Sequence, residues 1–315
     1  QLNNQDFYVT PSIGISLYPL DGEDEETLIK LADIAMYVAK EQGKNNFQFY
    51  SSQLNGLSSR KMDLENGLRK AIEQNQFQLY YQPQFELATG KIVGIEALIR
   101  WQHPEHGLIS PIEFISLAEE TGLIVPMGKW ILETACRQNK EWQDAGFAAV
   151  PIAVNISVRQ LQDDNFVEVV TKTLSQIGLD PKYIELEITE SIMQNIEKST
   201  VILNELKKHG VKISIDDFGT GYSSLSYLNH LPIDNIKIDK SFVDDIIKHS
   251  NQGAIVKTII DMGHNLNFNV IAEGIETEEQ VRFLKEHRCK VGQGYFYSRP
   301  LPPESIKEML IKTGS

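Results

Sequence analysis

The chain has 315 residues, of which 41% are hydrophobic, and a formal net charge of −13. This length and composition fit a soluble globular protein with one large domain and a fragment, or with two domains. The acidic charge excludes the basic surface that duplex nucleic acid requires, so a phosphate-bearing ligand would need divalent metal ions to neutralise it.

The first 50 residues read as a strand over 7–18 followed by an amphipathic helix. Apolar residues recur at helical spacing from Leu28 to Met36, and Gly43 stands where a helix tolerates positive φ at its end. One strand and one helix cannot build an independent core, so we expect 1–50 to be the last part of a longer domain. Apolar periodicity stops over 51–59, which predicts a linker.

A second organisation begins at residue 60. Two predicted strands, "FQLYYQPQFEL" and "KIVGIEALIRW", are joined by "ATGK", which is too short for a parallel crossover and therefore predicts an antiparallel pair. Six further strands alternate with helix-sized segments, which indicates right-handed βα units and a mostly parallel sheet. The six predicted strands are 150–157, 183–189, 211–217, 235–239, 269–275 and 291–296.

Eight strands in about 250 residues predict an α/β fold over 60–315, a closed (β/α)8 barrel of the TIM type with one antiparallel strand. The small α+β fragment precedes it. An open doubly wound sheet is the alternative.

Polar residues interrupt strands that should be continuously apolar in a sheet covered on both sides. Most of them lie at or near the carboxyl end of their strand, the end that forms the active face of a barrel. The polar residues are Glu96, Asn155, Glu187, Glu190, Asp216, Asp217, Lys237, Glu273 and Gln293.

Several buried carboxylates cannot all stay ionised without cations, and only Lys237 and Arg100 offset them in the strand pattern. Carboxylate and amide oxygens favour Mg²⁺ or Mn²⁺ over zinc. Asp216 and Asp217 would normally point to opposite faces, so both reach one site only where the strand ends and the glycine-containing "FGTG" loop turns. We interpret the pair as a clamp for two metal ions, with one carboxylate bridging them.

These residues lie in a set of strings that resembles the EAL-domain cyclic di-GMP phosphodiesterases, from about Arg60 to Lys312. Each string alone is weak evidence, but the ordered set is specific. The strings are "YYQP", "EALIRW", "VNIS", "ELEITES", "SIDDFGTGYSSL", "IKIDKSF", "IAEGIET" and "GQGYFYSRP".

The resemblance implies a modified barrel with one antiparallel strand and a role for each matched position. It implies that Glu96, Asn155, Glu187 and Asp216 bind a first metal, and that Asp216 and Asp217 hold a second. Lys237 would orient or help deprotonate the attacking water, Glu273 would support the metal and water cluster, and Gln293 would position the water. Glu190 would hold the "DDFGTG" loop, and Gln82 and Arg100 would contact the substrate, Arg100 at a phosphate.

The activity that the resemblance implies is hydrolysis of cyclic di-GMP to linear pGpG by a two-metal mechanism with a metal-activated water and two Mg²⁺ or Mn²⁺ ions. A catalytically silent cyclic di-GMP receptor is the alternative, and an enzyme for another phosphodiester is a third hypothesis. The family also suggests a homodimer.

Residues 1–50 are similar to the last part of a GGDEF diguanylate cyclase domain, whose defining string would precede Gln1. We therefore expect an upstream sensory or GGDEF region in the parent chain and no cyclic di-GMP synthesis by this chain alone.

Cysteine content and hydropathy favour a cytoplasmic location. Cys136 and Cys289 form no CxxC pair, which argues against a disulfide framework and a thiolate zinc site. No apolar stretch approaches the roughly 20 residues that span a bilayer, and the first residues do not resemble a signal peptide. Any membrane attachment of the parent protein is expected outside this chain.

Overall fold

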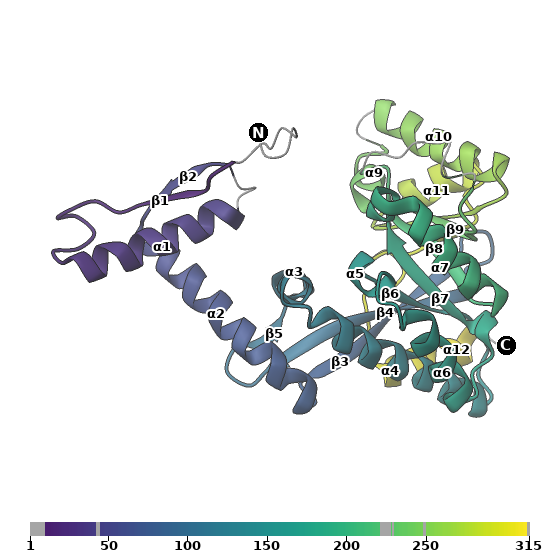
Figure 1. The fold of residues 1–315 in the computed structure, drawn as a ribbon. Coiled ribbons are helices and arrows are strands. Elements are labelled where there is room, and N and C mark those ends of the chain that lie inside the picture. Colours follow the sequence, from purple (N-terminus) through teal and green to yellow (C-terminus); the bar gives the residue numbers. More distant parts are fainter. Residues whose placement is uncertain (1–9, 42–44, 221–227, 229, 248–249, 314–315) are drawn as a thin grey trace. The chain divides into compact units, whose positions relative to one another are not determined.

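The computed structural model describes residues 10–41, 45–220, 228, 230–247 and 250–313 (Figure 1). It divides into two compact units, Gln1–Lys70 and Ala71–Ser315. Part of the predicted strand 7–18, the predicted helix end at Gly43 and part of the "GTGYSSL" string lie outside the described residues. No helix among those described has the length and the apolar character needed to cross a membrane.

In the first unit, helix α1 (Glu25–Glu41) packs against two short strands, β1 (Ile13–Ile15) and β2 (Phe47–Phe49). The strands pair in parallel, which the intervening helix makes possible. The sequence reading predicts the first strand and the helix but misses β2. Leu31, Ala35 and Val38 of α1 are buried, as their helical spacing predicts.

The predicted linker 51–59 has helical conformation. Helix α2 (Ser52–Glu73) covers all of it except Ser51 and continues to Glu73, over a segment in which the helical spacing of Leu64, Leu68 and Ile72 predicts a helix. Helix elongation adds one hydrogen bond for each residue that is fixed, so a helix that forms over 60–73 can extend through less favourable residues before it. The domain bounds 1–50 and 60–315 stay a prediction.

The second unit is a closed barrel of eight strands, so the open doubly wound alternative is wrong. Strand β3 pairs with both β4 and β11, which closes the ring, and both of these pairings are antiparallel. All other neighbours in the ring run parallel, so the predicted single reversed strand is confirmed. The barrel strands are β3 (Phe77–Glu86), β4 (Ile92–His103), β6 (Ile152–Ile156), β7 (Ile184–Thr189), β8 (Lys212–Phe218), β9 (Asn235–Ile238), β10 (Asn269–Ala272) and β11 (Val291–Gly292).

Three strands of this unit differ clearly from those that the sequence predicts, and one of them is β10, which ends at Ala272 although the sequence predicts 269–275. A short strand, β5 (Gly107–Ile109), extends β4 as an antiparallel hairpin outside the ring. Strand β11 has two residues, although 291–296 was expected. The ladder stops because the chain turns: the N–H groups of Tyr297 and Ser298 both donate to the Gly294 carbonyl. A Cβ at Gly294 would lie 2.1 Å from the Ile275 carbonyl oxygen, so only glycine allows this approach.

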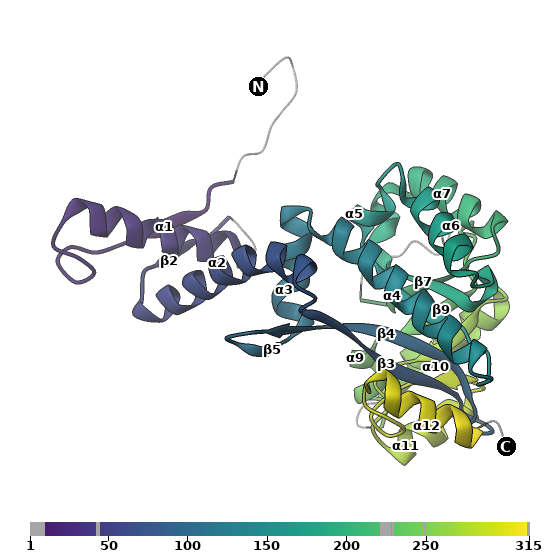
Figure 2. The ribbon, with the colours of Figure 1, turned by 90° about the horizontal axis from the view of Figure 1, so that it is seen from below.

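Helices cover the outside of the ring (Figure 2), with α4, α6 and α7 on one side and α11 and α12 on another. Aromatic side chains fill the space beneath them: Tyr81 packs on Trp142 with ring centroids 5.0 Å apart, and Phe77 packs on Trp101 at 5.8 Å. The helices are α3 (Pro111–Thr121), α4 (Ile124–Asp144), α5 (Val158–Leu161), α6 (Phe166–Ile177), α7 (Ile196–Lys208), α9 (Lys240–Asp244), α10 (Ser250–Asn265), α11 (Glu278–Glu286) and α12 (Pro303–Thr313).

Candidate active site

A buried lysine stands among carboxylates at the carboxyl ends of the parallel strands. Lys237 of β9 is fully buried, and its Nζ lies 2.8 Å from Glu187 Oε2 and 2.8 Å from Glu273 Oε1. Asp216 Oδ1 is 3.4 Å from the same nitrogen and Glu96 Oε2 is 3.5 Å from it. Burial would lower the pKa of Lys237, but these carboxylates outweigh burial and hold its pKa well above the ordinary value. The ammonium therefore stays charged.

Glu96 of β4 is held by two amides. Gln293 Nε2, just after β11, donates to Glu96 Oε2 at 2.5 Å and to Glu273 Oε1 at 2.9 Å. Asn155 Nδ2 of β6 donates to Glu96 Oε1 at 2.8 Å. Burial would raise the pKa of Glu96, but Lys237 and the two amides outweigh it and hold that pKa below its ordinary value. Glu96 is therefore a stable anion at neutral pH.

The backbone of β8 changes direction between the two adjacent aspartates. Asp217 has φ +53°, a left-handed conformation that is uncommon for residues other than glycine, and the pairing of β8 with β9 shifts register between Ile215 and Phe218. This irregularity lets consecutive side chains reach the same site. The sequence predicts the turn in the "FGTG" loop, but the turn begins one residue before that loop, at Asp217.

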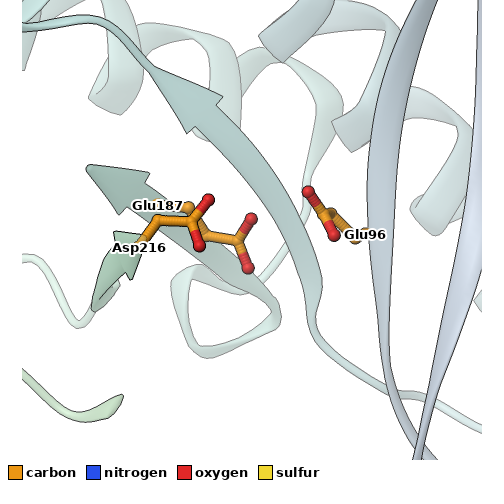
Figure 3. A group of neighbouring side chains, drawn as sticks. All are labelled: Glu96, Glu187 and Asp216. Carbon is orange, nitrogen blue, oxygen red and sulfur yellow. The ribbon is translucent and has the colours of Figure 1, made fainter. Parts of the chain in front are cut away.

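The carboxylates form two overlapping groups. Ligand oxygens of Glu96, Glu187 and Asp216 all lie within 4.8 Å of one another, and so do those of Asp216, Asp217 and Glu273. Figure 3 shows the carboxylates of the first group turned toward a common space. Asp216 belongs to both groups, which is the arrangement expected of a residue that bridges two cations.

The charges of this cluster are not balanced within the described residues. The buried Glu187 forms an ion pair with Lys237, but neither of its oxygens accepts a hydrogen bond of suitable geometry from the described residues. Burial, with the neighbouring Glu96, raises the pKa of Glu187 well above its ordinary value against the effect of Lys237. Burial likewise raises the pKa of Glu273 to about 8, and burial with the adjacent Asp216 raises that of Asp217 to about 6. Oxygen donors with unmet charge fit Mg²⁺ or Mn²⁺.

We expect the metal-free chain to lose stability as the pH rises from about 5.5 to about 8. Glu273 keeps its proton in the folded state up to about pH 8 and Asp217 up to about pH 6, whereas the unfolded chain releases both protons near their ordinary values, 4.5 and 3.8. Unfolding therefore releases protons in this window, and raising the pH favours it. The lowered pKa of Glu96 acts below 4.5, outside the window.

Thermal unfolding followed by circular dichroism, with EDTA or with Mn²⁺ at both pH values, measures this effect. The gain in unfolding temperature from Mn²⁺ should be larger at the higher pH. An EDTA-treated chain that becomes more stable across the window would contradict the expectation.

The other predicted residues surround this cluster. The backbone N–H of Gly219 donates to Glu190 Oε2 at 3.0 Å, so Glu190 contacts the loop that it is predicted to hold. Gln82 stands opposite Glu96 in the β3–β4 register and donates to the Ser298 carbonyl at 3.0 Å. Arg100 lies four residues beyond Glu96 on the same face of β4 and is half-buried, with its guanidinium over the Tyr80 ring.

A pocket of about 250 Å³ opens above the cluster. Gln82 lines it, whereas Arg100 is outside the lining. Three of its lining residues, Lys240, Glu276 and Tyr295, are exposed to solvent and form its mouth, and the sequence pattern does not single them out. Lys240 Nζ is 2.6 Å from Glu276 Oε1. The pocket residues are Gln82, Glu96, Leu98, Asn155, Asp216, Lys240, Glu273, Gly274, Glu276, Gln293, Gly294 and Tyr295.

A further carboxylate was missed. Asp239 follows β9, and its proximity contributes to the raised pKa of Asp217. Asp239 also accepts a hydrogen bond from the Ser241 backbone at 3.0 Å, as the N-cap of α9. Its position two residues after Lys237 at a strand end was the available signal, but an aspartate there also fits a simple helix cap.

Comparison with known proteins identifies two families. The EAL domain family matches residues 65–300, and the diguanylate cyclase, GGDEF domain family matches residues 1–46. The chain is 45% identical over 307 residues to the bifunctional diguanylate cyclase/cyclic di-GMP phosphodiesterase MucR of Pseudomonas aeruginosa, covering 97% of this chain and 45% of MucR. It is 43% identical over 310 residues to the cyclic di-GMP phosphodiesterase NbdA of the same organism, covering 98% of this chain and 40% of NbdA.

A solved structure of the PaMucR phosphodiesterase in a c-di-GMP complex is similar to this chain, with 46% identity and a TM-score of 0.76. The match covers 78% of this chain and 99% of the PaMucR chain. The present chain spans less than half the length of the two curated relatives.

Proposed function

The chain belongs to the EAL domain family, and from this premise we propose that it hydrolyses one phosphodiester bond of cyclic di-GMP to give linear pGpG in a reaction that depends on divalent metal ions. The observation that carries the proposal is the convergence of Glu96, Glu187, Asp216 and Glu273 on the buried Lys237 beneath an open pocket. Each residue that the family resemblance assigns to metal or water is present.

The cluster suits hard cations because its side chains offer carboxylate and amide oxygens as ligands. A first Mg²⁺ or Mn²⁺ would be held by Glu96, Asn155, Glu187 and Asp216, and a second by Asp216 and Asp217. The amide of Asn155 now donates to Glu96, so binding through its oxygen requires the amide to turn over. When bound, the two cations would supply charge neutralisation at the phosphate and acidify a water molecule.

Three side chains near the cluster would orient that water molecule or hold a proton beside it. Because the pKa of Lys237 is held well above its ordinary value, we assign its ammonium to donating a hydrogen bond and orienting the water, not to removing a proton. Gln293 bridges Glu96 and Glu273 and would help to position the water. Glu273, whose pKa is raised to about 8 by burial, is suited to hold a proton at its carboxylate near neutral pH.

An acidic chain can bind the phosphate groups of the substrate only if positive charges in the site compensate the negative charge of the phosphates. Arg100 offers a planar guanidinium on the same face of β4 as Glu96, where it would bind a phosphate oxygen. Gln82 lines the pocket and would contact the dinucleotide. Glu190, through Gly219, would fix the loop that carries Asp217.

The assay is incubation of the purified chain with cyclic di-GMP and Mg²⁺ or Mn²⁺, with an EDTA control, followed by chromatography. We expect pGpG with either cation and none with EDTA. Binding of intact cyclic di-GMP without product would instead support the silent receptor, and neither binding nor product would contradict both functions.

The matches to longer relatives support a larger parent protein. We propose that residues 1–46 are the end of a GGDEF domain in that parent and that the parent acts in the cytoplasm. Homodimer formation stays a prediction.

A further inference from the structure

A second polar layer lies inside the barrel, one step down the strands from the charged cluster. Glu185 of β7, Ser214 of β8 and Asn235 of β9 are buried. Asn235 Nδ2 lies 2.6 Å from Glu185 Oε1 and 3.0 Å from Ser214 Oγ, and Ser214 Oγ also donates to Glu185 Oε1. Asn269 of β10, which is exposed at the start of its strand, donates through Nδ2 to Asn235 Oδ1 at 3.0 Å. We call these four residues the lower layer.

The lower layer stands in a fixed relation to the charged cluster. Side chains two residues apart point to the same face of a strand, about 7 Å apart along it. On each of three neighbouring strands, a lower-layer residue comes two positions before a member of the cluster. The pairs are Glu185 with Glu187, Ser214 with Asp216, and Asn235 with Lys237.

We propose that the lower layer positions the charged cluster for divalent cation binding. This inference rests on the proposed function, because it takes the cluster to be the cation site. Glu187 of β7 and Asp216 of β8 place two carboxylates of one cation-ligand group on neighbouring strands, so the spacing of these strands sets the distance between the ligands. Hydrogen bonds from Asn235 and Ser214 to Glu185 tie the same strands together directly beneath.

Hydrogen bonds depend on distance and angle, so they restrict the spacing between neighbouring strands more than apolar contacts do. Removing groups that hydrogen-bond directly to metal ligands typically changes cation affinity or activity by about 10–100-fold. The lower layer acts on the ligands through the strands that carry both, so we expect an effect at the lower end of this range. The effect of the lower layer should therefore appear in cation affinity and in kcat. The KM for cyclic di-GMP should stay nearly constant, because none of these four residues lines the pocket.

The test compares Asn235→Leu with Asn139→Leu in the full chain. Asn139 is also buried and ties the barrel through two hydrogen bonds, to the carbonyls of Val150 at 3.2 Å and Tyr183 at 3.1 Å, but it lies on α4 outside the ring. Both substitutions should lower the unfolding temperature. Titration calorimetry with Mn²⁺ should show affinity weakened by about tenfold or more for Asn235→Leu and by less than about twofold for Asn139→Leu.

A milder variant covers the case in which Asn235→Leu does not fold. Ser214→Ala removes one hydroxyl and should weaken Mn²⁺ binding by less than about tenfold, with a matching fall in kcat. Unchanged Mn²⁺ affinity in the folded variants, with only a lower unfolding temperature, would overturn the proposal and leave the layer a structural one. Mn²⁺ affinity is read without substrate, so absence of turnover in the unsubstituted chain would contradict the proposed function alone.

Discussion

Substitution Glu187→Gln should abolish turnover and, in the absence of metal, stabilise the fold. Glutamine keeps the size of the side chain but removes a carboxylate from the first group of cation ligands. We expect kcat/KM for cyclic di-GMP to fall by at least about 10³-fold, equivalent to about 4 kcal/mol of transition-state stabilisation. Mn²⁺ affinity should fall as well.

The expected gain in stability of the metal-free variant follows from the raised pKa of Glu187 in the folded chain. At about pH 8 the unfolded glutamate ionises freely while the folded one is penalised for doing so, and glutamine removes this difference. The unfolding temperature in EDTA should therefore rise in Glu187→Gln. Glu205→Gln, on the exposed side of α7, is the control and should change neither property. A folded Glu187→Gln chain with unimpaired turnover would exclude this residue as a cation ligand.

Substitution Lys237→Met should destabilise the metal-free chain severely. It removes the cation that lies 2.8 Å from both Glu187 and Glu273 and leaves buried carboxylates facing one another. Breaking a buried ion pair by removing one partner costs about 3–5 kcal/mol. Urea unfolding in EDTA measures this loss. Mn²⁺ should restore part of it, because the added cations compensate the same carboxylates, whereas turnover should stay at least about 10²-fold below the unsubstituted chain.

Lys182→Met provides the control for burial. Lys182 Nζ lies 2.8 Å from Asp180 Oδ2, the same distance as in the buried pairs, but both side chains are exposed. Solvent screens this pair, so its loss should have little measurable effect. Equal losses in the two variants would show that the Lys237 cluster is not buried in solution.

The sequence predicts which side chains the barrel brings together, because polar residues interrupt the hydrophobic pattern of the strands there. Glu96, Glu187 and Lys237 interrupt apolar strands, and a closed barrel brings such strand ends to one face. The left-handed backbone at Asp217 was not predictable, since it depends on the register shift against β9. The early end of β11 was not predictable for a similar reason, because it depends on the turn after Gly294, and only glycine allows the close approach to Ile275 there.

Residues outside the strand pattern were harder to select. Lys240 and Tyr295 lie after strand ends in segments where charged and aromatic residues are ordinary, so only their placement at the pocket mouth marks them. Ser214 and Asn235 are small polar residues of a kind that often precedes a turn, and their connection through Glu185 exists only across three strands. Contacts between residues on different strands therefore determine which of these polar residues lie together, and local sequence preferences do not reveal those contacts.

The closure of the ring through β3 also determines when the site forms during folding. Gln293 and Glu96 are 197 residues apart in the chain, yet they are hydrogen-bonded. Contacts between such distant residues require closing a long loop before they contribute any free energy, and chains rich in them fold slowly. The two ends of the barrel must therefore meet before the cluster is complete, so a chain still being synthesised or partly unfolded lacks an assembled centre, and activity should report on completion of the fold.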